Sequence, residues 1–171
     1  MNTAAFSVRP TAESDWRHIR ELRLEMISDT PTAYTETLDD ALARDEAHWR
    51  MRGKRGTDDH GIAVVAIDDS GRWIGAMGGF VDETVGALLV GVYVTPDFRG
   101  REAGVLDALL TAVEAWARTE GGRLTLHVHE DNARAMASYE RRGFTFSGHA
   151  IPYNLDPSKN ELEMVKELSR Q

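Results

Sequence analysis

The chain has 171 residues, 42% of them hydrophobic, so it can bury one sizeable core, and we expect a single domain over residues 1–171. Its formal net charge of −8 argues against general binding to nucleic acid, and the absence of cysteine excludes disulfides, zinc–thiolate sites and a cysteine nucleophile. No apolar run approaches the roughly 18 residues of a membrane span, and residues 1–8 do not resemble a signal peptide. We therefore expect a cytoplasmic protein that binds neither membrane nor nucleic acid.

The first third of the chain predicts a short strand at residues 6–9 and two helices. Ser14 is expected to cap the first helix, whose apolar residues recur at helical spacing. These residues are Trp16, Ile19, Leu22, Met26 and Ile27. A second helix is expected over residues 38–52, and the Gly- and charge-rich stretch 52–61 is expected to be a long exposed loop.

The middle of the chain predicts three consecutive strands, at residues 62–68, 73–81 and 87–94. The turn residues Asp68-Asp69-Ser70-Gly71 favour a hairpin between the first two. The third strand is almost entirely apolar, which indicates burial on both faces.

The remaining segments alternate between helices and strands. In chain order they are a helix at 105–120, a strand at 124–128, a helix at 133–142 and strands at 144–147 and 162–168. The resulting order, β-α-α-β-β-β-α-β-α-β-β, predicts an α+β fold with α/β/α layers around a mixed, mostly antiparallel sheet of about six to seven strands. A parallel pair is expected near the middle of the sheet, where ligand clefts commonly form.

The connection before the 105–120 helix has features of an anion site. Arg99-Gly100-Arg101-Glu102-Ala103-Gly104 leads from Pro96 into the helix. The free N–H groups at the helix start, the helix dipole and the two arginines would together favour a pyrophosphate. By itself, the segment fits an ordinary strand-to-helix turn with two solvated arginines equally well.

This segment resembles the Arg/Gln-x-x-Gly-x-Gly/Ala motif of the GNAT superfamily of acetyltransferases. The resemblance extends to Val94-x-Pro96, to residues 126–132 and to Tyr139-Glu140-Arg141-Arg142-Gly143-Phe144, and it covers about residues 62–168. It implies an enzyme that moves an acetyl group from acetyl-coenzyme A to an amine, with a parallel strand pair that splays apart around the cofactor.

One residue departs from the family pattern, because Glu102 stands at the motif's central glycine. Its carboxylate would point into solvent and favour the helix N-terminus, repel the pyrophosphate, or mark a chain that no longer binds coenzyme A. We favour the first of these, since the Glu102 peptide N–H is still available.

The resemblance also implies which residues contact the cofactor. The pantetheine arm would lie along the backbone of Val92, Tyr93 and Val94, and the phosphates would lie against the loop. The loop residues are Arg99, Gly100, Arg101, Glu102, Ala103 and Gly104. Asn132 is either a second contact to the arm or a plain helix cap. No metal is expected.

Tyr139 is the leading catalytic residue that the resemblance implies. It lies seven positions after Asn132, two helical turns along, so the two side chains share a face. A tyrosine hydroxyl beside the thioester would also contact the cofactor and could protonate the departing thiolate. Without the surrounding motif, this tyrosine would be interpreted as a packing residue.

The general base and the acceptor site are less well defined. Residues 86–90, where many relatives place a glutamate, carry no titratable group. Nearby candidates for the base are Asp82, Glu83, His127 and His129, and a water-mediated route is an alternative. The regions that form the acceptor pocket in the family contain Tyr34, Glu36, Tyr153 and Trp49, the last of which has the spacing of a core residue.

The sequence therefore predicts acetylation of a primary amine, on a small molecule, by direct attack in a ternary complex. The alternatives are acetylation of a protein N-terminus or lysine, an inactive acyl-coenzyme A-binding module, and a purely structural domain. An exposed final strand would also offer an edge for a homodimer.

Overall fold

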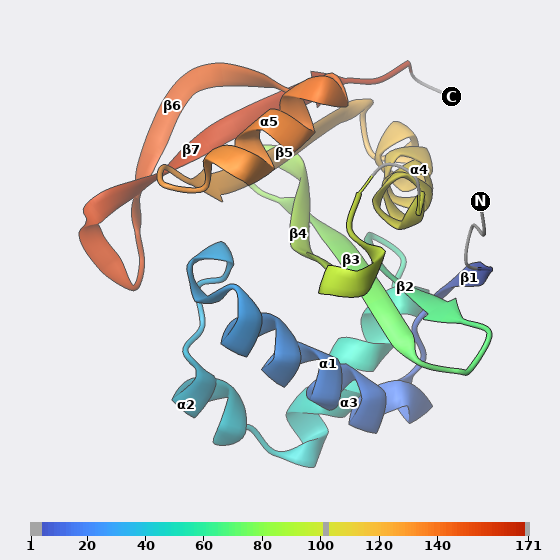
Figure 1. Ribbon diagram of the computed structural model, residues 1–171. Helices are drawn as coiled ribbons and strands as arrows, with labels where there is room; N and C mark the ends of the chain where they lie inside the picture. The colour runs from blue at the N-terminus through green and yellow to red at the C-terminus, as the bar shows by residue number, and fades with distance from the viewer. Residues whose placement is uncertain (1–4, 101–102, 170–171) are drawn as a thin grey trace.

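The computed structural model describes residues 5–100 and 103–169. Within these residues a seven-stranded sheet has the order β1-β2-β3-β4-β5-β7-β6 (Figure 1). The strands are β1 (Phe6–Pro10), β2 (Gly61–Asp68), β3 (Trp73–Asp82), β4 (Gly86–Val94), β5 (Arg123–His129), β6 (Thr145–Tyr153) and β7 (Asp156–Glu167). Strands β4 and β5 are parallel, and the other neighbours are antiparallel. The predicted mixed, mostly antiparallel sheet is confirmed.

Helices cover both faces of this sheet. The α-helices are α1 (Trp16–Asp29), α2 (Leu38–Leu42), α3 (Glu46–Lys54), α4 (Val105–Thr119) and α5 (Ala133–Arg141), and the short 3-10 turns are η1 (Glu13–Asp15), η2 (Pro31–Ala33), η3 (Arg55–Thr57) and η4 (Pro96–Phe98). Leu109 and Val113 of α4 belong to the larger apolar core, whereas Met26 of α1 and Trp49 of α3 form a second core with Tyr93 of β4. The three predicted layers are therefore present. None of the described helices has both the length and the apolar character that a membrane crossing requires.

The N-terminal helical region differs from the prediction in its boundaries. The helix expected over 38–52 is interrupted, because Asp45 caps a new helix by accepting the His48 N–H at 2.9 Å. Ser14 is not the cap of α1, since it lies inside η1, where the Asp15 carboxylate accepts the Ala12 N–H at 2.8 Å.

The stretch 52–61, expected to be an exposed loop, is mostly ordered as the end of α3 and η3. It packs closely on the segment after β1: the Thr11 hydroxyl donates to the Gly53 carbonyl at 2.9 Å, and Thr11 is buried. A Cβ atom at Gly56 would lie 2.2 Å from the Thr11 carbonyl oxygen. Glycine is thus required at this contact, which fixes the position of Arg55 beside it.

The C-terminal hairpin is longer than predicted, and β7 lies between β5 and β6. Its ladder with β5 runs from Arg123 opposite Glu167 to His129 opposite Glu161. The first residues of β7, from Asp156 to Glu161, are mostly exposed and polar, so they lack the apolar alternation that reveals a strand. This is why the prediction started the strand only at residue 162.

Strands β4 and β5 separate soon after they meet. They share one residue pair, Leu88 with Thr125, whereas the ladder of β4 with β3 continues to Val94. Beyond that pair, β4 contains a bulge in which Gly91 adopts a positive φ of 61° and Gly91 and Val92 together oppose Met77. The splayed parallel pair is confirmed, and it opens a gap in the centre of the sheet.

Candidate functional site

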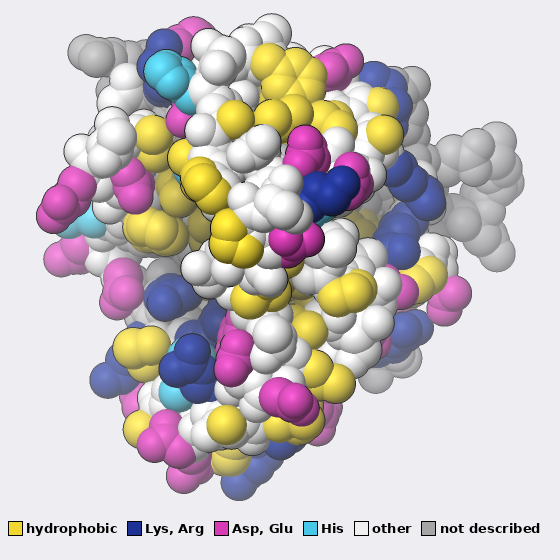
Figure 2. All heavy atoms as spheres, turned by 90° about the vertical axis from the view of Figure 1, so that its left-hand side faces the viewer, with side chains coloured by type: hydrophobic (Ala, Val, Ile, Leu, Met, Phe, Trp, Pro, Cys, Tyr) yellow, Lys and Arg dark blue, Asp and Glu magenta, His cyan; other side chains and the backbone are white. Residues whose placement is uncertain are grey.

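An open cleft of about 870 Å³ lies at the gap between β4 and β5. It extends from Gly100, before α4, past the backbone of β4 to Phe80 and Asp82 at the end of β3. Figure 2 shows a hollow on the corresponding face, with Lys and Arg side chains gathered below it. One wall is formed by the N-terminal helices and β4, and the other by β5, α5 and the β6–β7 hairpin.

The loop before α4 presents peptide groups at one end of the cleft. Gly100 and Gly104 adopt positive φ angles of 112° and 72°, which glycine tolerates, and Gly104 is the N-cap of α4. A glycine cap has no side chain to bond the first N–H groups of the helix, so these donors are available to an anion. Ala103 packs against the larger core. Arg101 and Glu102, on which the sequence predictions also fall, lie outside the described residues.

Arg99 is bound to the N-terminal wall. Its Nε donates to the Val94 carbonyl at 2.8 Å, and its Nη2 pairs with Asp29 of α1. The Asp29 carboxylate also accepts from the Tyr93 hydroxyl at 3.2 Å. The hydrogen bond from Arg99 is the main reason that the pKa of Asp29 is lowered.

The edge of β4 that faces the gap is bonded by side chains instead of a strand. The Val92 carbonyl accepts from the Tyr34 hydroxyl at 2.8 Å, as the Val94 carbonyl does from Arg99. Each carbonyl oxygen has a second lone pair, so both can still meet another donor. The Tyr93 side chain is buried in the second core, so its backbone is the part that could reach a ligand.

Asn132 and Tyr139 both line the opposite side of the cleft, as their spacing predicted. The Asn132 Oδ1 accepts the Ala135 N–H at 3.2 Å and so caps α5. The Tyr139 ring packs edge-on against Phe144, and its hydroxyl forms no hydrogen bond within residues 5–100 and 103–169. Burial raises the pKa of Tyr139, so the hydroxyl carries its proton at neutral pH and can act as an acid.

The residues predicted to contact the acceptor have different positions. Tyr34 lines the cleft, although its ring is buried and its hydroxyl is used by Val92. Tyr153 is buried behind Tyr34 and donates to the Tyr34 carbonyl at 2.6 Å. Glu36 pairs with Arg23 at 3.1 Å and does not line the cleft. Trp49 is a core residue, with 1% of its surface exposed.

Two of the predicted base candidates have one proton-accepting atom already engaged. Asp82 lines the cleft, but its Oδ1 accepts N–H groups of the following turn at 2.8 and 3.1 Å, and these bonds lower its pKa. His129 is buried, and its Nδ1 accepts the Asp131 N–H at 3.1 Å, which leaves the proton of the neutral ring on Nε2. Glu83 does not line the cleft. His127 does, with its Nε2 3.6 Å from the Glu163 carboxylate.

Sequence reasoning missed Glu161, a half-buried cleft carboxylate opposite His129 on β7. Burial raises the pKa of Glu161, which brings this carboxylate closer to the range of a general base at neutral pH. Its alternation with Glu163 could have revealed it, had the strand been predicted to begin earlier.

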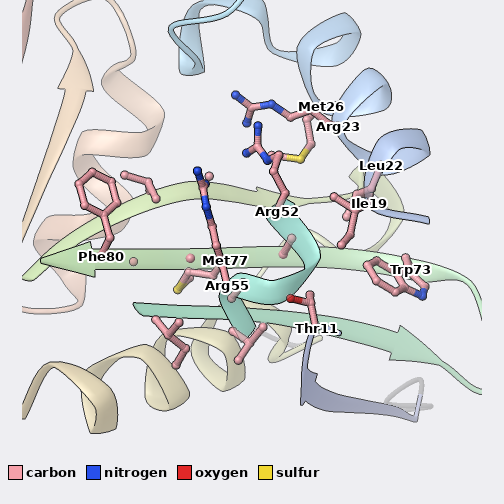
Figure 3. A pocket seen from close by; sticks show the side chains of 18 residues that line it. Thr11, Ile19, Leu22, Arg23, Met26, Arg52, Arg55, Trp73, Met77 and Phe80 are labelled. Carbon is pink, nitrogen blue, oxygen red and sulfur yellow. The ribbon is translucent and has the colours of Figure 1, made fainter. Parts of the chain in front are cut away.

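Sequence reasoning also missed three arginines on the N-terminal wall: Arg23 of α1, Arg52 of α3 and Arg55 of η3. Figure 3 shows their side chains extending over the sheet from two helical segments toward a common space. No local motif contains all three, because the segments that carry them are about 30 residues apart in the sequence.

Comparison with known proteins identifies a family model, described as the acetyltransferase (GNAT) family, that matches residues 20–144. No curated protein matches the chain. The matched segment includes β4, the loop before α4, and the helix that carries Tyr139.

Solved structures with the same fold include several acetyltransferases. A nourseothricin acetyltransferase is 28% identical over 65% of this chain and 67% of that chain, with a TM-score of 0.58. A phosphinothricin acetyltransferase from Sinorhizobium meliloti, solved with acetyl-coenzyme A, is 19% identical over 96% and 89% of the two chains, with a TM-score of 0.76. A ribosomal-protein-alanine N-acetyltransferase from Brucella melitensis is 20% identical over 95% and 99%, with a TM-score of 0.75.

Proposed function

The chain belongs to the acetyltransferase (GNAT) family and is an acyltransferase, and from this premise we propose that it transfers an acetyl group from acetyl-coenzyme A to the primary amine of a small molecule. The observation that carries the proposal is the gap between β4 and β5, which is lined by Tyr139, a residue whose hydroxyl forms no hydrogen bond to any described residue. Direct attack by the amine within a ternary complex is the reaction for which this cleft is suited.

The residues of the cleft fit acetyl-coenzyme A. The edge of β4 at Val92 and Val94 is not covered by another strand, and through the second lone pairs of these carbonyls it can bond an amide-containing arm as an added strand. The glycine-capped start of α4 offers N–H groups to a pyrophosphate, and Asn132 lies on the far side of the gap. When bound, the cofactor supplies an activated acetyl thioester.

Two residues of the cleft would then transfer protons in the reaction. Tyr139, whose pKa is raised by burial from an ordinary value already well above neutral pH, is protonated, and it would donate to the departing thiolate sulfur. Glu161, whose pKa is raised, would accept the proton of the attacking amine, directly or through water. Both side chains line the same cleft, which supports this division of roles.

Thermal unfolding with and without acetyl-coenzyme A tests the cofactor assignment. A ligand at 100 times its Kd stabilises the folded state by about 2.7 kcal/mol, or roughly 5–10 °C for a domain of this size. The Tyr139→Phe variant should keep this stabilisation while its kcat falls about 100-fold or more, because it loses only the acidic hydroxyl. Absence of stabilisation at saturating acetyl-coenzyme A would overturn the proposal.

A homodimer stays a prediction for this chain, but the final strand is not the edge that was expected, because β7 lies between β5 and β6. Strand β6 is at the edge of the sheet and exposes Phe146 and Ile151, with 45% and 43% of their surfaces accessible. An unpaired edge with apolar side chains is suited to pairing with a second copy. Sedimentation of wild type and a Phe146→Lys variant would show whether this edge is used.

A further inference from the structure

Positive charge is concentrated in the cleft although the protein as a whole is acidic. The formal net charge of the chain is −8. Among the described residues that line the cleft, by contrast, seven are arginines and two, Asp82 and Glu161, are carboxylates. Low-dielectric walls strengthen the field of such a cluster and attract ions of the opposite sign.

Three of these arginines lie at the end of the cleft that is remote from the loop before α4. Arg23, Arg52 and Arg55 line both the cleft and an adjoining pocket of about 90 Å³ against β2 and β3 (Figure 3). The part of β4 that lines this pocket is Val90 and Gly91. Since Val90 precedes Val94 by four residues, the arginines face a part of the strand roughly 13 Å from its phosphate-facing end. A role in binding the cofactor phosphates is therefore disfavoured.

The charge of this cluster is only partly neutralised. Glu36 Oε2 lies 3.1 Å from Arg23 Nη2 and 3.7 Å from Arg52 Nη1, and Glu36 Oε1 lies 3.6 Å from Nε of the exposed Arg44, so three arginines share one carboxylate. The Arg55 guanidinium forms no ion pair or hydrogen bond with the described part of the chain, and the guanidinium of Arg52 feels Arg23 and Arg55 as like charges. Burial lowers the pKa of Arg52 to about 10, which still leaves it protonated at neutral pH.

An anion placed among the three side chains would relieve this imbalance. Cations withdrawn from water are costly unless they are paired, and arginine pairs especially well with carboxylate and phosphorus oxyanions. The opposite wall carries Glu161, which suits the ammonium form of an amine before it loses its proton.

We propose that the acceptor carries an anionic group beside its amine, as an amino acid does, and that Arg55, with Arg23 and Arg52, binds this group. The amine then faces Glu161 across the cleft. The proposal rests on the proposed acetyltransferase function and deepens it, because it names the class of acceptor.

A panel of matched acceptors tests this class. Release of the coenzyme A thiol is measured with free amino acids, with their carboxamides, with the corresponding aminophosphonates, and with spermidine and a short peptide. We expect turnover of the acids or the phosphonates, and a kcat/KM about 10- to 100-fold lower for the carboxamides, which lack the charged hydrogen-bond acceptor. The preferred member of the acid and phosphonate pair identifies the anion as a carboxylate or a phosphorus oxyanion.

The outcomes separate this inference from the proposed function. If carboxamides, spermidine or the peptide react as well as the acids, the anionic acceptor is wrong. It is also wrong if acetyl-coenzyme A stabilises the protein but no anionic member of the panel reacts. If acetyl-coenzyme A does not stabilise the protein, the proposed function itself fails.

A matched pair of arginine variants assigns the effect to the cluster. Arg55→Gln should raise the KM for the anionic acceptor about 10- to 100-fold, leave the KM for acetyl-coenzyme A unchanged, and be partly rescued in Arg55→Lys. Arg50 lies on α3 and pairs with Glu46 in solvent, so Arg50→Gln should change neither value. An equal effect of the two Gln variants, or an equal loss with the carboxamide, would contradict the inference. Melting temperatures show whether Arg55→Gln is folded, and the acceptor panel stands independently of the variants.

Discussion

The two walls of the cleft are built in different ways: both carry arginines, but Glu161 is on the C-terminal wall, and the cluster of Arg23, Arg52 and Arg55 is on the N-terminal wall. The C-terminal wall is a regular antiparallel ladder, in which register places Glu161 directly opposite His129. The N-terminal wall gathers Arg23, Arg52 and Arg55 from α1, α3 and η3, with Glu36 between the first two. A ladder fixes its side chains through neighbouring backbone bonds, whereas the arginine wall depends on the packing of separate helices.

This difference also suggests how an acceptor is oriented. Glu161 on one wall and the three-arginine cluster on the other form a dipolar pair, and a molecule with an amine at one end and an anion at the other matches it in a single orientation. The Tyr139 hydroxyl lines the same space. The C-terminal wall would then accept the proton of the amine, and the N-terminal wall would bind the anionic group of the acceptor.

Replacement of Glu161 on β7 should have the largest effect on activity. With the best acceptor of the panel, Glu161→Gln is expected to lower kcat about 100-fold, because the amide cannot accept a proton from the amine. Since burial raises the pKa of Glu161, wild-type activity should fall as the pH drops through that raised value, and the variant should lack this acidic limb. The measurement is kcat/KM against pH.

The matched control is Glu163→Gln, two residues further along β7. Glu163 faces His127 and does not line the cleft, so its replacement should preserve the acidic limb. If both variants keep the limb, the base is another group or water, and the two walls do not divide the chemistry as described.

The sequence predicts the C-terminal wall of the cleft better than the N-terminal wall, for a physical reason. The seven-residue spacing of Asn132 and Tyr139 along one helix is a local feature, so the sequence places both residues on one wall of the cleft. Glu161 was missed because the first residues of β7 are polar and lack the alternation of apolar and polar side chains that reveals a strand. The three arginines could not be found from the sequence, since nothing in their local spacing indicates that α3, which leads into η3, packs on α1.

Replacement of Glu36, the carboxylate that pairs with the arginines of the N-terminal wall, should lower the stability of the fold instead of kcat. Glu36→Gln leaves Arg23, Arg52 and the exposed Arg44 without this counter-ion, and both Arg23 and Glu36 side chains are about 10% exposed. Breaking a buried pair costs 3–5 kcal/mol, and we expect about 3 kcal/mol here, because the Gln amide oxygen can still accept a hydrogen bond. Urea denaturation measures the free energy of unfolding.

Glu46→Gln is the comparison for this variant. Glu46 forms an exposed pair with Arg50 on α3, so its loss should cost no more than about 0.5 kcal/mol. Equal losses for the two variants would mean that Glu36 does not hold the arginine wall together. A sulfate or acetate addition that restores the stability of Glu36→Gln would sharpen the comparison, because an anion would then replace the missing carboxylate.

The smallest expected effect is the acid sensitivity of the ion pair that ties Arg99 to the N-terminal wall. The hydrogen bond from Arg99, and secondarily its charge, lowers the pKa of Asp29 in the folded protein. A depressed pKa contributes stability above the unfolded value, near 3.9, and this contribution is lost as the pH falls below about 4 through the folded value. Because about a third of the Asp29 side chain is exposed, we expect no more than about 1 kcal/mol. The melting temperature of wild type should therefore exceed that of Asp29→Asn at pH 7 and approach it near pH 3.

Asp69→Asn, in the exposed turn between β2 and β3, should show no such convergence, and a constant gap for Asp29→Asn would mean that its charge does not stabilise this wall.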